Sequence, residues 1–335
     1  MGRSTSYLNF LRIFSAVLVI LLHCIAPFYS SLVYFENRSW WICGVLNSVT
    51  RTAVPMFFMM SGYLMLTNPK TLDIKKFYKK RLPRLIIPLT VWNIIYYIYY
   101  NNGNLSLSDF FNQLLGSGAA YHLWFVYSML GFYLILPFLK RITDNCTDKQ
   151  LLVLLTVLSF TGTIRPLINT VFPVYIWFFD VIANGYIPYF ILGYLLGKSE
   201  LNFKNRIIVY IGGVLGAFMS IFGNWYYSSS ESISLIANEA YRLNHALCAC
   251  AILVLFKQIN WDKFTRLCNA AENWSKRTFG IYFIHALVLD ISVKYVPNSF
   301  APGESIIYRF LITTIFSFFI TYIIDKIKPL SKLLM

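Results

Sequence analysis

The stretch from residue 8 to residue 30 reads LNFLRIFSAVLVILLHCIAPFYS. It is long and apolar enough to cross a bilayer, yet it carries Arg12 and His23, which lie eleven residues apart. An α-helix turns by about 100° per residue, so eleven residues return to within roughly 20° of the same direction. Both side chains are therefore predicted to share one face of a membrane helix, roughly 16 Å apart along its axis. Ionisable groups within a membrane are costly and usually mark a functional site.

The residues between these two on the same face are small, and those on the opposite face are bulky. The small set is Ser15, Ala16 and Val19, and the bulky set is Phe10, Phe14, Leu18 and Leu21. The helix is therefore expected to turn a groove toward the protein interior, with a cation near one membrane surface and an imidazole deep inside.

The composition is that of a polytopic membrane protein. Of the 335 residues, 57% are hydrophobic and only 13% are charged, whereas soluble proteins carry about 25% charged residues. The partner of this chain is therefore the lipid bilayer. The net charge of +15 is not interpreted as a nucleic-acid signal, because basic residues of membrane proteins gather in cytoplasmic loops.

The apolar runs predict an all-α bundle of about ten transmembrane helices in a single domain, residues 1–335. The expected spans are 8–30, 41–66, 85–100, 122–139, 150–164, 181–197, 207–223, 243–257, 278–294 and 305–324. With both termini in the cytoplasm, 23 of the 29 Lys and Arg residues fall on the inner side, which fits the positive-inside rule. The least regular region is the fifth span, which ends at Arg165-Pro166. The outer loop 101–121 contains an amphipathic stretch near Leu107–Leu115.

His23 is the best candidate for catalysis. Histidine titrates near neutral pH and serves as a general base when it is held near a hydroxyl group. The alternative is a structural role, in which a buried histidine bridges two helices by hydrogen bonds.

The run Lys79-Lys80-Arg81-Leu82-Pro83-Arg84 precedes the third span. Pro83 favours the first position of a helix, which places Arg84 in the first turn and Arg81 just before it. Helix N-termini offer free N–H groups to anions, and arginines add bidentate contacts, so this segment is predicted to bind phosphate. The alternative is that the basic run only anchors the topology.

Several further segments carry polar groups at spacings that fit a site. Ser61 and Gly62 end the second span, where Gly62 permits close helix approach and Ser61 is expected to lie near a donor site. His122 and Trp124 open the fourth span, either in an interfacial aromatic belt or in contact with a sugar. Tyr282 and His285 share a helix face, and His285 is expected near mid-membrane and facing the bundle interior, where these residues either bridge helices or line the site. Arg51 either binds an anionic acceptor or extends to the interface. We assign no role to His245 or Asp290.

Other chemistries lack their motifs. The chain has no Gly-x-Ser-x-Gly elbow, no phosphate-binding P-loop, no His-Glu-x-x-His and no cysteine pair with zinc spacing, and we predict no metal. The six cysteines are interpreted as reduced, small hydrophobic residues. The first apolar run lacks a cleavage signature, so it is expected to remain as a membrane helix.

Taken in order, these segments resemble the membrane acyltransferase family 3, which O-acylates bacterial cell-surface carbohydrates. Arg12 and His23 match the family's Arg/Lys-x10-His pattern, and Arg81 with Arg84 its Arg-x-x-Arg pattern. The stretch 57–63 matches its Phe-Phe-x-x-Ser-Gly-Tyr pattern, and 121–125 and 278–285 match two further blocks.

The resemblance implies an acetyl-CoA donor bound near Arg12, Arg81 and Arg84, a catalytic His23, and a location in the bacterial inner membrane. The acceptor would be a saccharide or lipid-linked glycan. One departure is Asn9, where many relatives have Asp, and another is the lack of an extracellular SGNH-type esterase domain. Transfer is therefore expected to finish within the membrane domain.

Three alternatives stay open. The first is a transporter or exporter of a glycan or small metabolite, although no matched pair of broken helices is evident. The second is a sensor with a pocket and no turnover. The third, within the same family, is an O-succinyltransferase.

Overall fold

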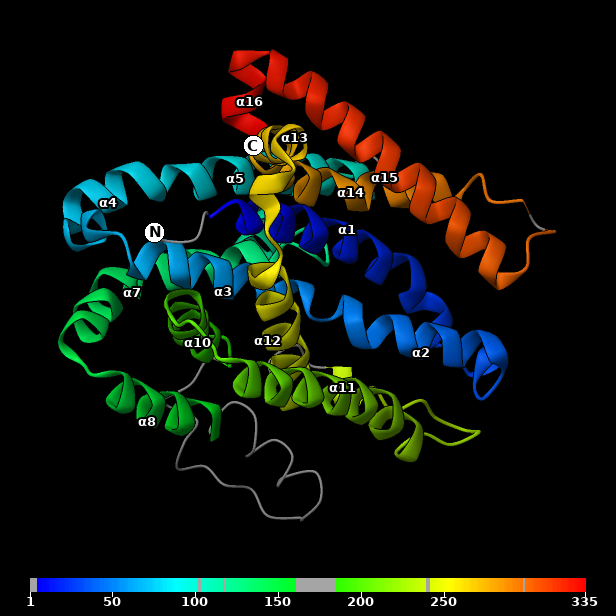
Figure 1. The fold of residues 1–335 in the computed structure, drawn as a ribbon. Helices are drawn as coiled ribbons and strands as arrows, with labels where there is room; N and C mark the ends of the chain where they lie inside the picture. Colours follow the sequence, from blue (N-terminus) through cyan, green and yellow to red (C-terminus); the bar gives the residue numbers. More distant parts are fainter. Residues whose placement is uncertain (1–4, 102–103, 117, 161–184, 239–241, 298) are drawn as a thin grey trace.

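The structure is a computed structural model that describes residues 5–101, 104–116, 118–160, 185–238, 242–297 and 299–335 (Figure 1). Within these ranges, all regular structure is helical. The α-helices are α1 (Ser6–Tyr29), α2 (Arg38–Thr50), α3 (Ala53–Leu66), α4 (Ile74–Arg81), α5 (Pro83–Asn101), α6 (Leu107–Leu115), α7 (Trp124–Asn145), α8 (Asp148–Ser159), α10 (Ile187–Lys198), α11 (Phe203–Tyr226), α12 (Leu243–Gln258), α13 (Thr265–Ser275), α14 (Thr278–Val293), α15 (Pro302–Lys326) and α16 (Lys328–Leu334).

Six stretches of the described chain are long and apolar enough to cross a membrane. They are Ser6–Tyr29, Arg38–Leu66, Trp124–Asn145, Phe203–Tyr226, Ile236–Gln258 and Pro302–Lys326, of which Ile236–Gln258 runs over 239–241, outside the described ranges. The shorter apolar helix α14 adds a further candidate. The predicted all-α membrane bundle is confirmed. The count of ten spans, the cytoplasmic termini and the single domain stay predictions, and the end of the fifth span at Arg165-Pro166 lies outside the described residues.

The predicted span 41–66 consists of two helices rather than one. Helix α2 ends at Thr50 and α3 begins at Ala53, with Arg51 and Thr52 between them. The cause is Pro55, which has no N–H group and whose ring collides with the carbonyl four residues earlier in a continuous helix. Hydrogen bonds from the N–H groups of Arg51 and Thr52 to the carbonyls of Asn47 and Val49, both 3.1 Å, close the end of α2.

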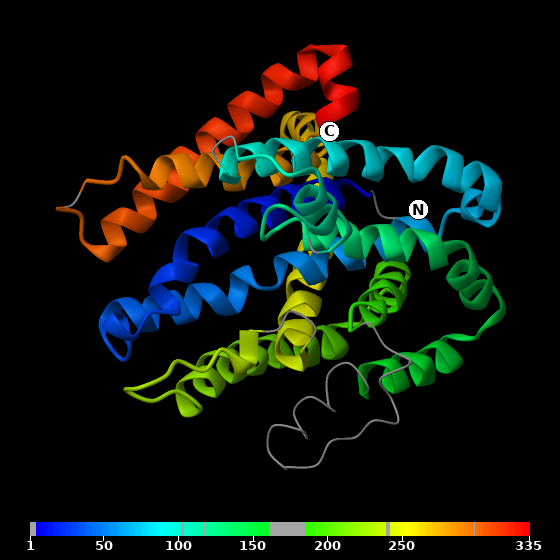
Figure 2. The ribbon, with the colours of Figure 1, turned by 180° about the vertical axis from the view of Figure 1, so that it is seen from behind.

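Helix α1 runs through the interior of the bundle, where it contacts α2, α3, α12, α13, α14 and α15 (Figures 1 and 2). Its bulky face packs on the segment around α12. The rings of Phe10 and Trp261 stack with centroids 4.0 Å apart, and those of Phe14 and Phe256 lie 5.2 Å apart. Because both faces of α1 are covered by protein, its ionisable side chains are kept away from lipid.

Helices α3 and α10 approach so closely that their backbones touch. A Cβ atom added at Gly62 would lie 2.2 Å from the carbonyl oxygen of Phe190, and one at Gly193 would lie 2.1 Å from that of Met59. This confirms the prediction that Gly62 permits close helix approach. The contact fixes the position of the neighbouring Ser61.

Candidate functional site

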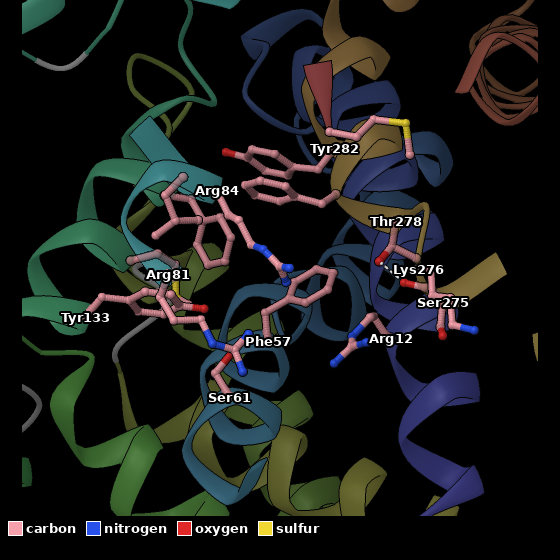
Figure 3. A pocket seen from close by; sticks show the side chains of 15 residues that line it. Arg12, Phe57, Ser61, Arg81, Arg84, Tyr133, Ser275, Lys276, Thr278 and Tyr282 are labelled. Atoms are coloured by element: carbon pink, nitrogen blue, oxygen red, sulfur yellow. Dashed lines mark hydrogen bonds between the residues drawn. The ribbon is translucent and has the colours of Figure 1, made fainter. Parts of the chain in front are cut away.

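A cleft of about 330 Å³ opens where α1, α3, α5, α7, α13 and α14 meet. Its lining includes Arg12 from α1, Arg81 from the end of α4 and Arg84 from the start of α5. Figure 3 shows the three arginine side chains extending from opposite walls toward one space around the ring of Phe57. Tyr133 of α7 lies close enough to interact electrostatically with all three. The structure thus brings together three residues predicted to bind an anionic cofactor.

The junction of α4 and α5 positions two of these arginines. Pro83 is the first residue of α5, as predicted. The N–H groups of Leu85 and Ile86 do not, however, point freely into the cleft, because both donate to the carbonyl of Leu82, at 3.0 and 2.9 Å. The bond of Ile86 is the ordinary first i→i−4 bond of an α-helix, whereas the bond of Leu85 takes up an amide that a helix start often leaves free. Phosphate binding at this helix N-terminus stays a prediction.

The wall beside Arg12 comes from α13, α14 and the turn between them. Ser275, Lys276 and Thr278 line the cleft together with Ser61 of α3. Ser275 donates a hydrogen bond of 2.8 Å to Oδ1 of Asn9, so the residue that departs from the family pattern helps to hold this wall. Sequence reasoning missed Ser275 and Lys276, because the basic segment 257–277 was treated only as a topology signal.

Lys276 is also part of an exposed ion pair. Its Nζ lies 2.8 Å from Oε1 of Glu272, one turn earlier on α13. This hydrogen bond holds the pKa of Glu272 below its ordinary value. The pair reduces the positive charge that Lys276 adds to the cleft, so most of the positive charge of the described lining comes from the three arginines.

Three histidines from distant parts of the sequence meet beside the cleft. The rings of His23 and His285 stack with centroids 5.3 Å apart, and those of His122 and His285 lie 5.0 Å apart. The ring of Tyr121 contacts His23 at 4.9 Å. His122 and His285 are buried. We call His23, His122 and His285 the histidine cluster.

The hydrogen bonds of the histidine cluster leave proton acceptors available. Nδ1 of His285 lies 2.5 Å from the carbonyl oxygen of Tyr282. A carbonyl can only accept, so Nδ1 carries the hydrogen, and Nε2 of a neutral His285 keeps its lone pair. Within the described residues, this Nε2 and a ring nitrogen of His122 are buried without a hydrogen-bond partner. Buried polar atoms without partners are rare and indicate a ligand or a catalytic role.

Tyr282 stands between the cleft and the histidine cluster. It lines the cleft, and its ring lies 5.4 Å from that of His122 and 5.8 Å from that of His285. Its hydroxyl donates a hydrogen bond to the backbone carbonyl of His122. Phe125 packs against Tyr282 at 5.3 Å and lines the cleft as well. The two rings form a shared wall between the arginines and the histidines.

Arg51 lies on a polar network near the histidine cluster. Its Nε donates to Oδ1 of Asn47 at 3.3 Å, and Asn47 in turn donates to Asn238 at 2.7 Å. Arg51 is close enough for its charge to act on His23 and on His245. This places Arg51 at the break between α2 and α3, within electrostatic reach of His23.

The structure places other predicted features away from the histidine cluster. The ring centroid of Trp124 lies 5.6 Å from that of Tyr186 and 6.3 Å from that of Phe125, and none of its described ring contacts is with a histidine. Ser15, Ala16 and Val19 are buried, and none of them lines the cleft, so the groove expected along them is not part of it. The walls of the cleft come from α3, α7 and α14 instead.

Comparisons with known proteins locate the chain in a family. It is 24% identical over 347 residues to a curated protein of Enterococcus faecalis named amino-acid racemase, an alignment that covers 96% of this chain and 46% of that protein. The chain thus spans about half the length of the relative it matches. No solved structure matches. The sequence profile described as "Acyltransferase domain" matches residues 5–326, nearly the whole chain. The chain therefore belongs to this acyltransferase family.

Proposed function

We propose that the protein transfers an acetyl group from cytosolic acetyl-CoA to a hydroxyl group of a cell-surface or lipid-linked saccharide, with His23 as the general base. The observation that carries this proposal is the arrangement of the site. A cleft lined by Arg12, Arg81 and Arg84 lies against the histidine cluster, and Tyr282 belongs to the surroundings of both. An acyltransferase needs such an arrangement, because the thioester carbonyl carbon of its anionic donor must lie near the general base that takes the proton of the attacking hydroxyl group.

The arginines fit the donor. Coenzyme A carries several phosphate groups, and guanidinium groups bind phosphate by paired, charge-assisted hydrogen bonds. Arg81 and Arg84 follow the basic segment 75–80, which is expected on the cytoplasmic side, where acetyl-CoA is made available. Ser61 and Thr278 add hydroxyl groups to the walls along which the pantetheine arm would lie. The acetyl thioester would then reach the histidine cluster past Tyr282.

The histidine cluster fits the chemistry. His23 takes the proton of the acceptor hydroxyl as the oxygen attacks the thioester carbonyl carbon. The new C–O bond forms, the C–S bond breaks, and the thiolate of coenzyme A leaves with the proton that His23 returns. His122 and His285 present unpartnered nitrogens to the acceptor, and Arg51 supplies a positive charge for an anionic sugar. Trp124 has no described ring contact with the histidine cluster, so it would affect the site only through its contact with Phe125.

The acceptor class rests on resemblance. The stretch 47–51 leading into 54–58 resembles that of the enterobacterial common antigen O-acetyltransferase, and on this resemblance we propose a saccharide acceptor in the bacterial inner membrane. A succinyl donor is the alternative within the family. Mass spectrometry of surface polysaccharide, with and without the gene, separates the two by the mass that is added.

The direct test uses protein purified into lipid nanodiscs and supplied with acetyl-CoA and membrane glycan. We expect release of free coenzyme A together with acetylated glycan, and loss of both in His23→Ala. The matched control is His245→Gln, which changes a buried histidine whose Nε2 lies 2.8 Å from the carbonyl oxygen of Ala237. Full activity of His23→Ala would reject the general-base role. A protein that never consumes acetyl-CoA but moves glycan across the membrane would be a transporter.

A further inference from the structure

A second cleft of about 310 Å³ lies between the end of α11 and the beginning of α12. Most of its lining is apolar or aromatic. The described lining residues are Phe218, Met219, Phe222, Gly223, Tyr227, Ile236, Ala237, Arg242, Leu243 and Asn244. None of these residues belongs to the arginine-lined cleft or to the histidine cluster, so the proposed acyl transfer does not account for this site.

Arg242 is the one charged residue of this described lining. Its exposed fraction is 7%, and within the described chain neither its Nε nor its Nη1 has a hydrogen-bond partner. No acidic side chain belongs to the described lining, and a buried guanidinium is strongly unfavourable unless an anion lies beside it.

The second cleft lies beside a helix whose surface is expected to meet lipid. In the apolar 18-residue stretch of α11, only 22% of the stretch is buried inside the protein. Val214, Leu215 and Phe218 are exposed along this helix. The helix ends with Trp225 and Tyr226, which are aromatic residues typical of the boundary between hydrocarbon and headgroups. An apolar cleft that holds a buried cation therefore lies at the level where a lipid headgroup meets its chains.

We propose that the second cleft binds one anionic phospholipid of the outer half of the membrane. Its phosphodiester pairs with the guanidinium of Arg242, and an acyl chain packs along Phe218 and Phe222. A net negative charge is required because no described acidic residue lines the cleft to neutralise Arg242. A saccharide headgroup fits less well, since the lining offers few hydrogen-bonding groups for sugar hydroxyls.

The test is lipid retention, measured by native mass spectrometry of the detergent-purified protein after incubation with phosphatidylglycerol or phosphatidylcholine. We expect the wild type to retain phosphatidylglycerol preferentially. Arg242→Gln should lose about tenfold in retention, because a charge-assisted contact is removed, and Arg242→Lys should keep part of it. The matched control is Arg38→Gln, which removes an exposed arginine expected on the same side of the membrane.

The possible results of this experiment distinguish between the molecules that could occupy the second cleft. Equal retention of the two lipids by the wild type, or an unchanged preference in Arg242→Gln, would overturn the proposal. Retention of a lipid-linked saccharide diphosphate but not of phosphatidylglycerol would overturn it in favour of an acceptor site.

A thermal melt of each variant shows whether it is folded. If Arg242→Gln is unfolded, Leu243→Trp replaces it as the test, because this substitution narrows the apolar part of the cleft from an exposed position. An unchanged lipid preference in Leu243→Trp would then count against the proposal.

Discussion

Neighbouring basic residues at the start of the third predicted span differ in whether their side chains line the cleft. Arg81 and Arg84 reach into the arginine-lined cleft, whereas Lys79 and Lys80 are exposed and do not line it. Arg81→Ala should therefore raise the KM for acetyl-CoA about tenfold, since it removes a charge-assisted phosphate contact, and should leave kcat largely unchanged. Steady-state kinetics in nanodiscs at low and high salt measure this. Lys80→Ala is the control, and an equal rise in KM for both variants would show that only the general charge of the loop matters.

Tyr282 supports a different prediction, because it acts through position rather than charge. Its hydroxyl donates to the backbone carbonyl of His122, in the segment that brings His122 to the histidine cluster. Tyr282→Phe should lower kcat about fivefold, which corresponds to a net hydrogen bond of about 1 kcal/mol, with little change in the KM for acetyl-CoA. A change confined to KM would instead place the Tyr282 hydroxyl on the donor.

For single residues, the sequence predicted the relative positions of Arg12 and His23 on α1, but it did not predict which histidines meet. Helical geometry alone placed Arg12 and His23 on one face. The meeting of His23, His122 and His285 could not be predicted, because it depends on tertiary contacts between α1, the start of α7 and α14. Lys276 was missed for a related reason: a basic residue near a membrane helix has the same sequence signature whether it faces a cleft or solvent.

Among the helices, the contact between α3 and α10 is the one most sensitive to substitution. A Cβ at Gly62 would collide with the backbone of Phe190, whereas one at Gly131 of α7 would meet nothing within 4 Å. Gly62→Ala should therefore lower the melting temperature by several degrees, since overpacking costs about 1–3 kcal/mol. Gly131→Ala should melt at or slightly above the wild-type temperature, because alanine favours helix more than glycine. Thermal denaturation in detergent decides, and equal melting of both variants would argue against the close helix contact.

Element boundaries were predictable where apolar periodicity dominates. The amphipathic stretch at 107–115 is α6, with the same bounds. The short basic helix α4 and the amphipathic α13 were not predicted, because their charged residues mask them in a search for apolar runs. The interruption between α2 and α3 could have been predicted from Pro55, but the hydropathy of 41–66 is that of one continuous span.

For the whole molecule, the distribution of Lys and Arg predicts which end faces the cytoplasm. The arginine-lined cleft must open there if acetyl-CoA is the donor. In a variant whose native cysteines are replaced, Lys79→Cys should react with a membrane-impermeant maleimide only after the cells are opened, whereas Ser229→Cys should react in intact cells. The inverse pattern would place the cleft outside and remove cytosolic acetyl-CoA as its ligand.

Hydropathy and charge were enough to predict an all-helical membrane protein, because they follow from the cost of exposing polar groups to lipid. They do not specify which helices are neighbours. The cleft depends on α1 lying against α3 and α14, and this adjacency is set by side-chain packing across the bundle rather than by any local pattern.

The central place of α1 has a consequence for biogenesis. Helix α1 leaves the ribosome before α14, yet groups that surround its Arg12 and His23 belong to α14 and to other later helices. During synthesis, α1 must therefore hold a guanidinium and an imidazole beside lipid before their final neighbours are present. We expect α1 to wait at the insertion machinery until its companions arrive. Crosslinks from Val17 to the translocation channel should therefore persist until α14 has been translated.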